Sequence, residues 1–308
     1  MKWLQDISFT DTDLEVLRID DQGGVLFVDP MPQDVPDTEP ADPVPGTEQA
    51  PVSTLDDAFS LHSNPGAPRV VYIDFDGHTI SGTAWNGGGA DLEAEAYDLD
   101  GDPNTFNDTE RTRIVDIWHR VAEDLAPFDI DVTTEEPAVF DRYTGRILVT
   151  RDVDALGNDM PARGAGGVAY VNVFGRSDYH TFYSPALVYF NNLGGGGETY
   201  VAEASSHEFG HNLGLSHDGT TTGTTYYGGH GSGLVSWAPI MGNSYSRNVT
   251  QWSRGEYANA NQLQDDLAII EGKLGLKGDD HGDTIGAGTP LLIGGDGSVV
   301  ASNPEFDP

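Results

Sequence analysis

The sequence predicts a mixed α/β fold, in which one sheet packs against two or three helices. A β-branched apolar run at 69–77 predicts a buried strand. An amphipathic stretch at 107–128 predicts a long helix, and several apolar runs follow it before a second helical stretch. A strand, a helix, several strands and a closing helix are the element order of a mixed sheet domain.

The first helix carries signals at both ends. Asn107 and Glu110 have the spacing of a capping box, and Pro127 marks the end of the helix. Apolar side chains recur between them at helical spacing: Ile114, Ile117, Trp118, Val121 and Leu125. Four more strands are expected at 128–134, 146–152, 167–175 and 186–192. Two more helices are expected near 199–213 and at about 260–274.

The two ends of the chain differ in composition from its middle. Residues 1–67 are expected to be a leader, either the remnant of a propeptide or a plain spacer. The Pro-rich, acidic stretch 29–51 predicts an extended, disordered linker, and ordered structure is expected to begin near Arg69. Residues 276–308 are expected to be a linker and the start of a further, truncated module.

The charge of the chain limits its partners. There are 15 basic residues against 50 acidic ones, a net charge of −35. This excludes nucleic acid as a natural partner and disfavours anionic membranes, since both need basic patches. Two explanations stay open: a solvated surface suited to salty surroundings, or carboxylate clusters that bind structural Ca²⁺. Asp98, Asp100 and Asp102 alternate as in calcium loops, but Pro103 stands where an EF-hand needs glycine.

Two absences in the sequence narrow the chemistry and the location. The chain has no cysteine, which excludes disulfides, thiol catalysis and cysteine zinc ligands. No apolar run is long enough to insert into a membrane. The N-terminus has no apolar core of a signal peptide, so we expect either a trimmed chain or an export signal of another kind.

The segment 202–219 carries the catalytic pattern. His207 and His211 are four residues apart, so a helix places both imidazoles on one face, one turn apart. Glu208 lies about 100° further round that helix, from where its carboxylate can reach a metal-bound water.

A glycine then allows a third imidazole to join. Gly214 stands where a helix can end in a left-handed residue, and the reversal returns His217 to the same ion. Three neutral imidazoles and one water form an open, catalytic zinc site. Ordinary surface histidines or an inactive zinc site are the alternatives, and Glu208 at this spacing favours the active one.

The pattern HExxHxxGxxH is the signature of the metzincin zinc proteases. With Asp218 after the third histidine, it resembles the reprolysin (adamalysin-like) branch, and 69–274 looks like its bacterial secreted members. The resemblance implies a five-stranded mixed twisted sheet, an active-site helix and a smaller C-terminal subdomain below a cleft. It also implies a catalytic domain at 68–275 and an edge strand, at 167–175 or 186–192, that binds extended substrate.

Two further residues follow from the resemblance. Met241 would form the turn that metzincins place beneath the imidazoles, although alone it would be ordinary core. Tyr245 is four residues further on, whereas related enzymes have a tyrosine two residues after the methionine, so its role stays open. Animal reprolysins rely on disulfides, which this chain lacks, and Pro239 stands where they usually carry a cysteine.

The sequence therefore predicts a secreted, monomeric metalloendopeptidase that hydrolyses peptide bonds of protein substrates through a zinc-activated water. Zinc would be held by His207, His211 and His217, and Glu208 would be the catalytic base. A metal-stabilised binding module and a structural protein without metal are the alternatives. A cysteine latency switch is excluded, and an aspartate of the acidic leader could block the zinc instead.

Overall fold

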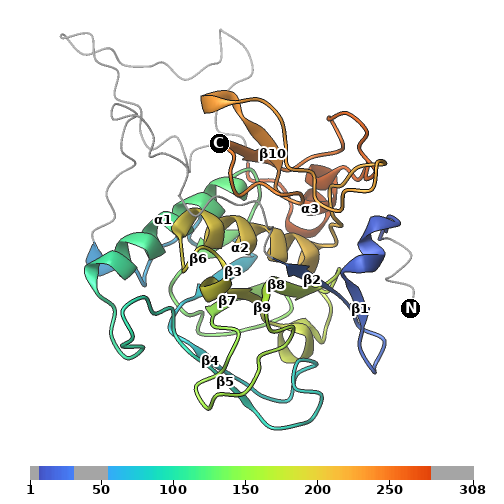
Figure 1. Ribbon diagram of the computed structural model, residues 1–308. Coiled ribbons are helices and arrows are strands. Elements are labelled where there is room, and N and C mark those ends of the chain that lie inside the picture. Colours follow the sequence, from blue (N-terminus) through green and yellow to red (C-terminus); the bar gives the residue numbers. More distant parts are fainter. Residues whose placement is uncertain (1–6, 31–54, 279–308) are drawn as a thin grey trace, which may run out of the picture.

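A seven-stranded sheet forms the centre of the protein, in the order β1-β2-β8-β9-β7-β3-β6 (Figure 1). The computed structural model describes residues 7–30 and 55–278. The strands of this sheet are β1 (Leu17–Ile19), β2 (Val25–Pro30), β3 (Val70–Asp74), β6 (Asp131–Thr133), β7 (Thr144–Thr150), β8 (Ala165–Tyr170) and β9 (Ala186–Tyr189). A mixed α/β fold is thereby confirmed.

One side of the sheet, from β9 to the edge strand β6, is parallel, and the other side is antiparallel. Strand β3 pairs in parallel with β6 and β7, and β7 pairs in parallel with β9. Every residue of β7 and β9 is buried, as expected for strands covered on both faces. Strand β8 runs antiparallel to β9, and β2 and β1 continue the antiparallel order beyond it.

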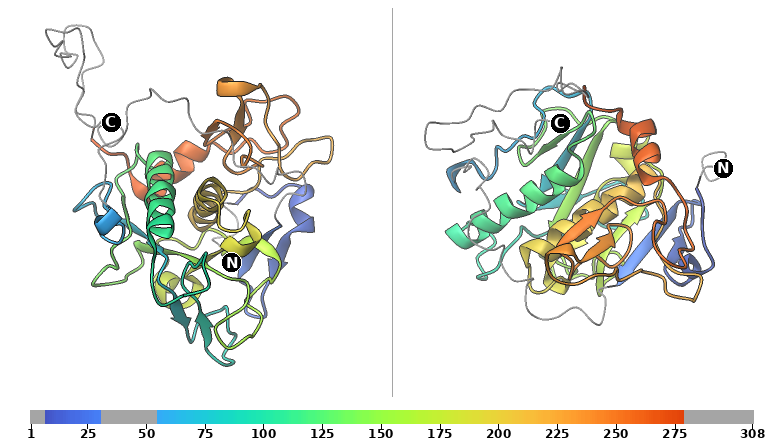
Figure 2. Two further views of the ribbon diagram at one scale, coloured as in Figure 1. Left: turned by 60° about the vertical axis from the view of Figure 1, so that its left-hand side comes forward. Right: turned by 90° about the horizontal axis from the view of Figure 1, so that it is seen from above.

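Two long helices lie side by side on one face of the sheet (Figure 2). Helix α1 (Asp108–Asp124) packs along α2 (Glu198–Leu213), and α2 also packs on β7, β8 and β9. The predicted capping box of α1 is confirmed: the Asn107 side chain accepts from the Glu110 amide, and the Glu110 carboxylate accepts from the Asn107 amide.

Smaller elements surround this frame. Strands β4 (His78–Ile80) and β5 (Leu92–Ala94) form a two-stranded sheet, and β10 (Trp237–Pro239) pairs in parallel with β11 (Val249–Gln251). Helix α3 (Asp266–Leu274) packs against α2. The short helical turns are η2 (Thr12–Glu15), η3 (Leu55–Asp57), the π-type turn η4 (Tyr179–Tyr183), η5 (Phe190–Asn192) and η6 (Gly233–Val235). Among the described helices, none combines the length and apolarity needed to cross a bilayer.

The structure corrects the prediction that order begins near Arg69. Residues 7–30 are folded, and β2 is an integral strand of the main sheet (Figure 1, blue). Asp29 and Pro30, placed in the linker by composition, are the last residues of β2. The sheet therefore has five strands of the expected domain and two more from the leader. Most of the predicted linker and nearly all of 276–308 lie outside the described residues.

Two other boundaries differ for local reasons. Strand β8 ends at Tyr170, because the chain then turns towards the end of α2, where the amide of Asn172 donates to the carbonyl of His211 (2.8 Å). Helix α3 begins later than predicted, since Asp265 caps it by accepting from the amide of Ala268 (3.1 Å).

Candidate metal centre

Helix α2 carries the first two histidines of the motif. His207 and His211 are both buried, and their ring centroids are 4.7 Å apart. The helix is buried along almost its whole length, because the sheet, α1 and α3 all pack against it. The rotamers of the two imidazoles are therefore constrained by packing on a rigid element.

The third imidazole joins the cluster through the predicted glycine reversal. Gly214 ends α2 with a φ of +114°, a left-handed conformation that costs glycine little. Its amide donates to the carbonyl of Gly210 (3.1 Å), and the chain turns back. The Nε2 atom of His217 then lies 3.1 Å from Nε2 of His211.

Each of the three imidazoles is oriented by a hydrogen bond at Nδ1. His207 donates to the carbonyl of Ile240 (2.8 Å) and His211 to the carbonyl of Leu215 (2.8 Å). His217 faces a carboxylate instead, with Nδ1 at 3.0 Å from Oδ1 of Asp13. These partners leave the Nε2 lone pairs directed at one point, as in metal sites whose ligands have fixed tautomers.

A carboxylate from the leader completes the cluster. Asp29 places Oδ1 2.9 Å from Nε2 of His217 and Oδ2 3.2 Å from Nε2 of His211. Its Oδ2 is 3.9 Å from Nε2 of His207. One ligand atom from each of these four side chains lies within 4.8 Å of the other three. No specific aspartate of the leader was predicted as a ligand, although Val25, Phe27 and Asp29 alternate as in a strand.

This donor set fits a zinc ion. Three imidazole lone pairs and an ionised carboxylate repel one another at these distances unless a metal ion or a proton lies between them. Tetrahedral zinc with ligands at about 2.0–2.1 Å separates neighbouring donor atoms by about 3.3 Å, which is close to the distances above. Both Nε2 of His207 and Oδ2 of Asp29 are buried and lack a hydrogen-bond partner among the described residues.

The electrostatics of the cluster also favour a cation. Burial, and then the neighbouring His211, lower the pKa of His207 to about 3, which keeps it a neutral donor. Burial also opposes charge on His217, but the carboxylates of Asp29 and Asp13 outweigh it and raise its pKa to about 9. The leader carboxylates therefore stabilise positive charge at this position.

Glu208 lies between α2 and β8. A Cβ atom added to Gly167 would come within 2.1 Å of Oε1 of Glu208, so the strand needs glycine to admit this carboxylate. Gly167 pairs directly with Asp29 across β8 and β2, which brings the two carboxyl groups together. Burial, and then the charge of Asp29, raise the pKa of Glu208 well above its ordinary value.

Met241 and Tyr245 lie near this cluster in different ways. Met241 is buried beneath α2, where a Cβ atom on Gly210 would meet its Sδ atom at 2.7 Å. The preceding residue, Ile240, supplies the carbonyl that orients His207. Tyr245 packs edge-on against Tyr200, and any contact of Tyr245 with substrate stays a prediction.

Another tyrosine, Tyr226, was not predicted from the sequence. It donates its hydroxyl to Oδ1 of Asp29 (2.6 Å).

Asp98 and Asp100 of the acidic loop after β5 form a second carboxylate cluster with Glu110 of α1. Its oxygens are engaged by the chain itself: Asp98 accepts from the amide of Gly101 (2.7 Å), and Glu110 accepts from the amides of Leu99 and Asn107. Asp102 is not part of the cluster. These bonds account for the loop without an ion, and calcium stays a prediction.

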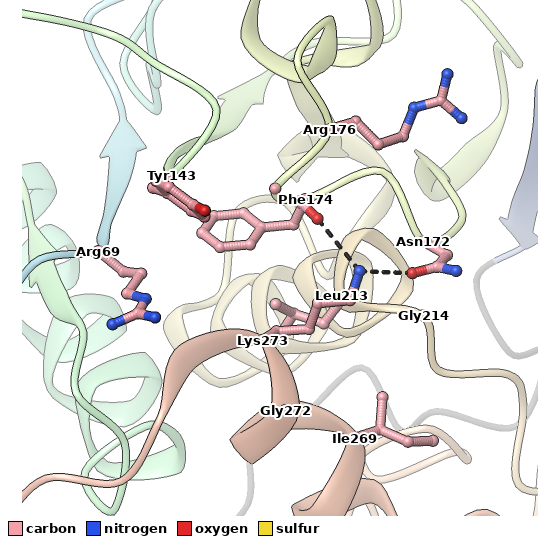
Figure 3. Close-up of a pocket in the computed structure, with 11 residues that line it drawn as sticks. Arg69, Tyr143, Asn172, Phe174, Arg176, Leu213, Gly214, Ile269, Gly272 and Lys273 are labelled. Carbon is pink, nitrogen blue, oxygen red and sulfur yellow. Dashed lines mark hydrogen bonds between the residues drawn. The ribbon is translucent and has the colours of Figure 1, made fainter. Parts of the chain in front are cut away.

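A separate cavity of about 530 Å³ lies at the C-terminal end of α2 (Figure 3). Lys273 of α3 donates there to the side chain of Asn172 (2.6 Å) and the carbonyl of Phe174 (3.2 Å). The Asn172 side chain in turn packs close to Gly214, where an added Cβ atom would meet its Oδ1 at 3.2 Å. The cavity wall therefore supports the reversal that brings His217 to the cluster, and none of the three imidazoles lines it.

Comparison with known proteins identifies this region. Residues 134–218 match the family described as metallo-peptidase family M12B, reprolysin-like. The match begins next to β6 and ends at Asp218, so it includes α2 and all three imidazoles. No curated protein matched, and no solved structure matched. The predicted resemblance to reprolysin-like metallopeptidases is thereby confirmed, and with it the class of metalloendopeptidase.

Proposed function

Because the chain carries a reprolysin-like metallopeptidase segment that contains its cluster of imidazoles, we propose that it is a zinc-dependent endopeptidase of protein substrates. His207, His211 and His217 would hold the zinc, and Glu208 would act as the catalytic base. The proposal rests on three imidazoles whose Nε2 atoms converge, while their Nδ1 atoms are each hydrogen-bonded to a carbonyl or a carboxylate.

The chemistry divides between the ion and the protein. When bound, zinc would polarise the scissile carbonyl and lower the pKa of water to about 7. Glu208 would take the proton of the attacking water and deliver it to the leaving amine. Gly167 supports this role, because it lets the Glu208 carboxylate lie against β8, along which a peptide would run.

Strand β8 is the proposed platform for substrate. Among the five strands of the expected domain, β8 is the edge strand next to β2. Strand β2 of the leader pairs with it in an antiparallel register. An extended peptide could add to the same edge through main-chain hydrogen bonds. Its scissile bond would then pass the imidazoles and Glu208, which lie on the α2 side of this strand.

The test is Glu208→Gln, which keeps the size of the side chain and removes the base. It is assayed alone and together with Asp29→Ala, since the Asp29 carboxylate lies where a water would bind. We expect zinc to be retained and peptide cleavage to fall by a factor of about 10² to 10⁴ relative to the matched chain with Glu208. Equal cleavage rates in these two chains would refute the role of Glu208.

Secretion and a monomeric state belong to the same proposal. Reprolysin-like sequence supports an extracellular site of action, and the net charge of −35 supports a well-solvated surface. Fractionation of the native host tests the first prediction. Light scattering of the purified chain tests the second, and a mass near twice 33.0 kDa would contradict it.

A further inference from the structure

The leader occupies the strand edge that a substrate would need. Strand β2 pairs with β8 in an antiparallel register that is regular from Leu26 to Asp29 and shifts at Pro30, with Phe27 opposite Ala169 and Asp29 opposite Gly167. Phe27 is fully buried, and its ring lies 4.6 Å from the ring of His211 and 4.3 Å from that of His217. An extended peptide cannot pair with β8 while β2 is there.

Residues opposite each other in such a pair point to the same face of the sheet. The Asp29 side chain therefore points where a side chain at Gly167 would, towards Glu208 and the imidazoles. Tyr226 also holds the Asp29 carboxylate by donating its hydroxyl to Oδ1 (2.6 Å). The Asp29 carboxylate therefore lies where a fourth ligand of the metal would bind. The strand register, the absence of a side chain at Gly167 and the hydrogen bond from Tyr226 together fix it there.

A second leader carboxylate acts on one of the imidazoles. Asp13 is fully buried and accepts from Nδ1 of His217 (3.0 Å). Its other oxygen accepts from the amide of Thr10 (2.6 Å) and the hydroxyl of Thr10 (2.9 Å), which fixes the carboxylate in η2. By contrast, His207 and His211 are oriented by carbonyls of the enzyme body itself. The orientation of His217 thus depends on the leader.

We propose that residues 7–30 are a latency segment that holds the zinc site with two carboxylates, Asp29 as a ligand and Asp13 as the support of His217. The inference rests on the proposed zinc site. While the segment is in place, the fourth position and the substrate edge are both filled. When it leaves, water replaces Asp29, and His217 loses its partner at Nδ1. The latent form therefore binds zinc more tightly than the open form.

The experiment uses the full chain loaded with zinc or, for spectroscopy, with Co²⁺. The variants are Asp29→Ala, its closer analogue Asp29→Asn, Asp13→Ala and, as a matched control, Asp21→Ala, which changes an exposed acidic residue of the same leader. The readouts are the visible spectrum of bound Co²⁺, the rate of zinc loss to a chelator and the rate of peptide cleavage.

We expect Asp29→Ala to change the Co²⁺ spectrum. Without this ligand the segment should also leave β8 more often, so cleavage should rise by at least about tenfold, as for release of a state populated at 10% or less. Asp13→Ala should weaken zinc binding by about 10- to 100-fold, the usual effect of losing a partner of a metal-bound histidine. Asp21→Ala should match the wild type in all three measurements.

The outcomes separate this inference from the proposed function. Wild-type spectra in both Asp29 variants, or wild-type zinc loss in folded Asp13→Ala, would overturn the inference, whether or not the chain cleaves peptides. A changed spectrum in Asp29→Ala with faster zinc loss in Asp13→Ala, but no cleavage in any variant, would support the hold of the two carboxylates on the metal site and refute the protease and its latency.

Discussion

Gly167 of β8 and Glu208 of α2 fit together so closely that a methyl group on Gly167 would lie 2.1 Å from the Glu208 carboxylate. We therefore predict that Gly167→Ala displaces this carboxylate and lowers kcat by about 100-fold or more, because a general base must stay within hydrogen-bond reach of its proton. Cleavage is measured with and without Asp29→Ala. Gly272→Ala is the control, since its added Cβ meets nothing within 4 Å.

Zinc content should be retained in Gly167→Ala, since none of the three imidazoles is altered. A Gly167→Ala enzyme with wild-type kcat would show that Glu208 has room to act elsewhere, and that the contact across β8 and α2 does not position the base.

His217 is the imidazole that the Gly214 reversal brings back to α2. It is removed by His217→Ala in a chain that also carries Asp29→Ala, because the Asp29 carboxylate would otherwise supply a third ligand. Two imidazoles remain, too few for the open zinc site of three protein ligands. We predict that zinc falls from about one equivalent per chain to well below it after dialysis, measured by elemental analysis. His180→Ala, in η4, serves as the control and should keep its zinc. Full zinc content in the chain with both substitutions would contradict the role of His217 as a ligand.

Removing the metal should destabilise the fold, because a ligand that binds the folded chain and not the unfolded one adds its binding free energy to stability. A ligand at 1,000 times its Kd contributes about 4.1 kcal/mol to stability. For a chain of this size, about 1 kcal/mol corresponds to roughly 2–4 °C, so a chelator should lower the unfolding temperature by about 8–16 °C. Differential scanning calorimetry checks this, with zinc re-addition as the control. The chain with both His217→Ala and Asp29→Ala should respond little.

His62 predicts a pH dependence far from the metal cluster. Its Nδ1 lies 2.7 Å from Asp131 and its Nε2 3.0 Å from Glu135. Burial opposes the charged ring, but hydrogen bonds to Glu135 and Asp131 outweigh it and raise the pKa of His62. A raised pKa in the folded state stabilises the protein fully below the unfolded-state value of about 6.5 and loses this effect as the pH rises through the folded-state pKa.

The free energy of unfolding of His62→Gln should therefore fall further below that of the wild type at about pH 5.5 than at about pH 9. Denaturant titrations at the two pH values measure the difference. Glu135→Gln should show part of the same change, because it removes one of the two carboxylates. An equal loss at both pH values would mean that the charge on His62 contributes nothing.

Local signals predicted the frame of the protein well. The capping box at Asn107, the paired imidazoles of α2 and the turn at Gly214 each depend on residues a few positions apart, and all three are found as expected. The apolar runs also predicted the five strands of the enzyme body, since strands buried on both faces need continuous apolar sequence.

The leader was misjudged because its structure depends on distant partners. The Pro-rich, acidic composition after Asp29 favours a disordered linker, yet β2 is stabilised by β8, more than 130 residues further along the chain. Asp13 meets His217 across 204 residues. No local pattern specifies such pairs. The alternation of Val25, Phe27 and Asp29 was the available signal, and it indicates a strand without naming its neighbour.

The central claim is that three imidazoles share one zinc ion, and X-ray absorption at the zinc edge of the purified full chain tests it most directly. We predict about one zinc per chain with three imidazole nitrogens and one oxygen donor at about 2.0–2.2 Å. Protein free of zinc after loading, or a spectrum with fewer than three imidazoles, would contradict the account.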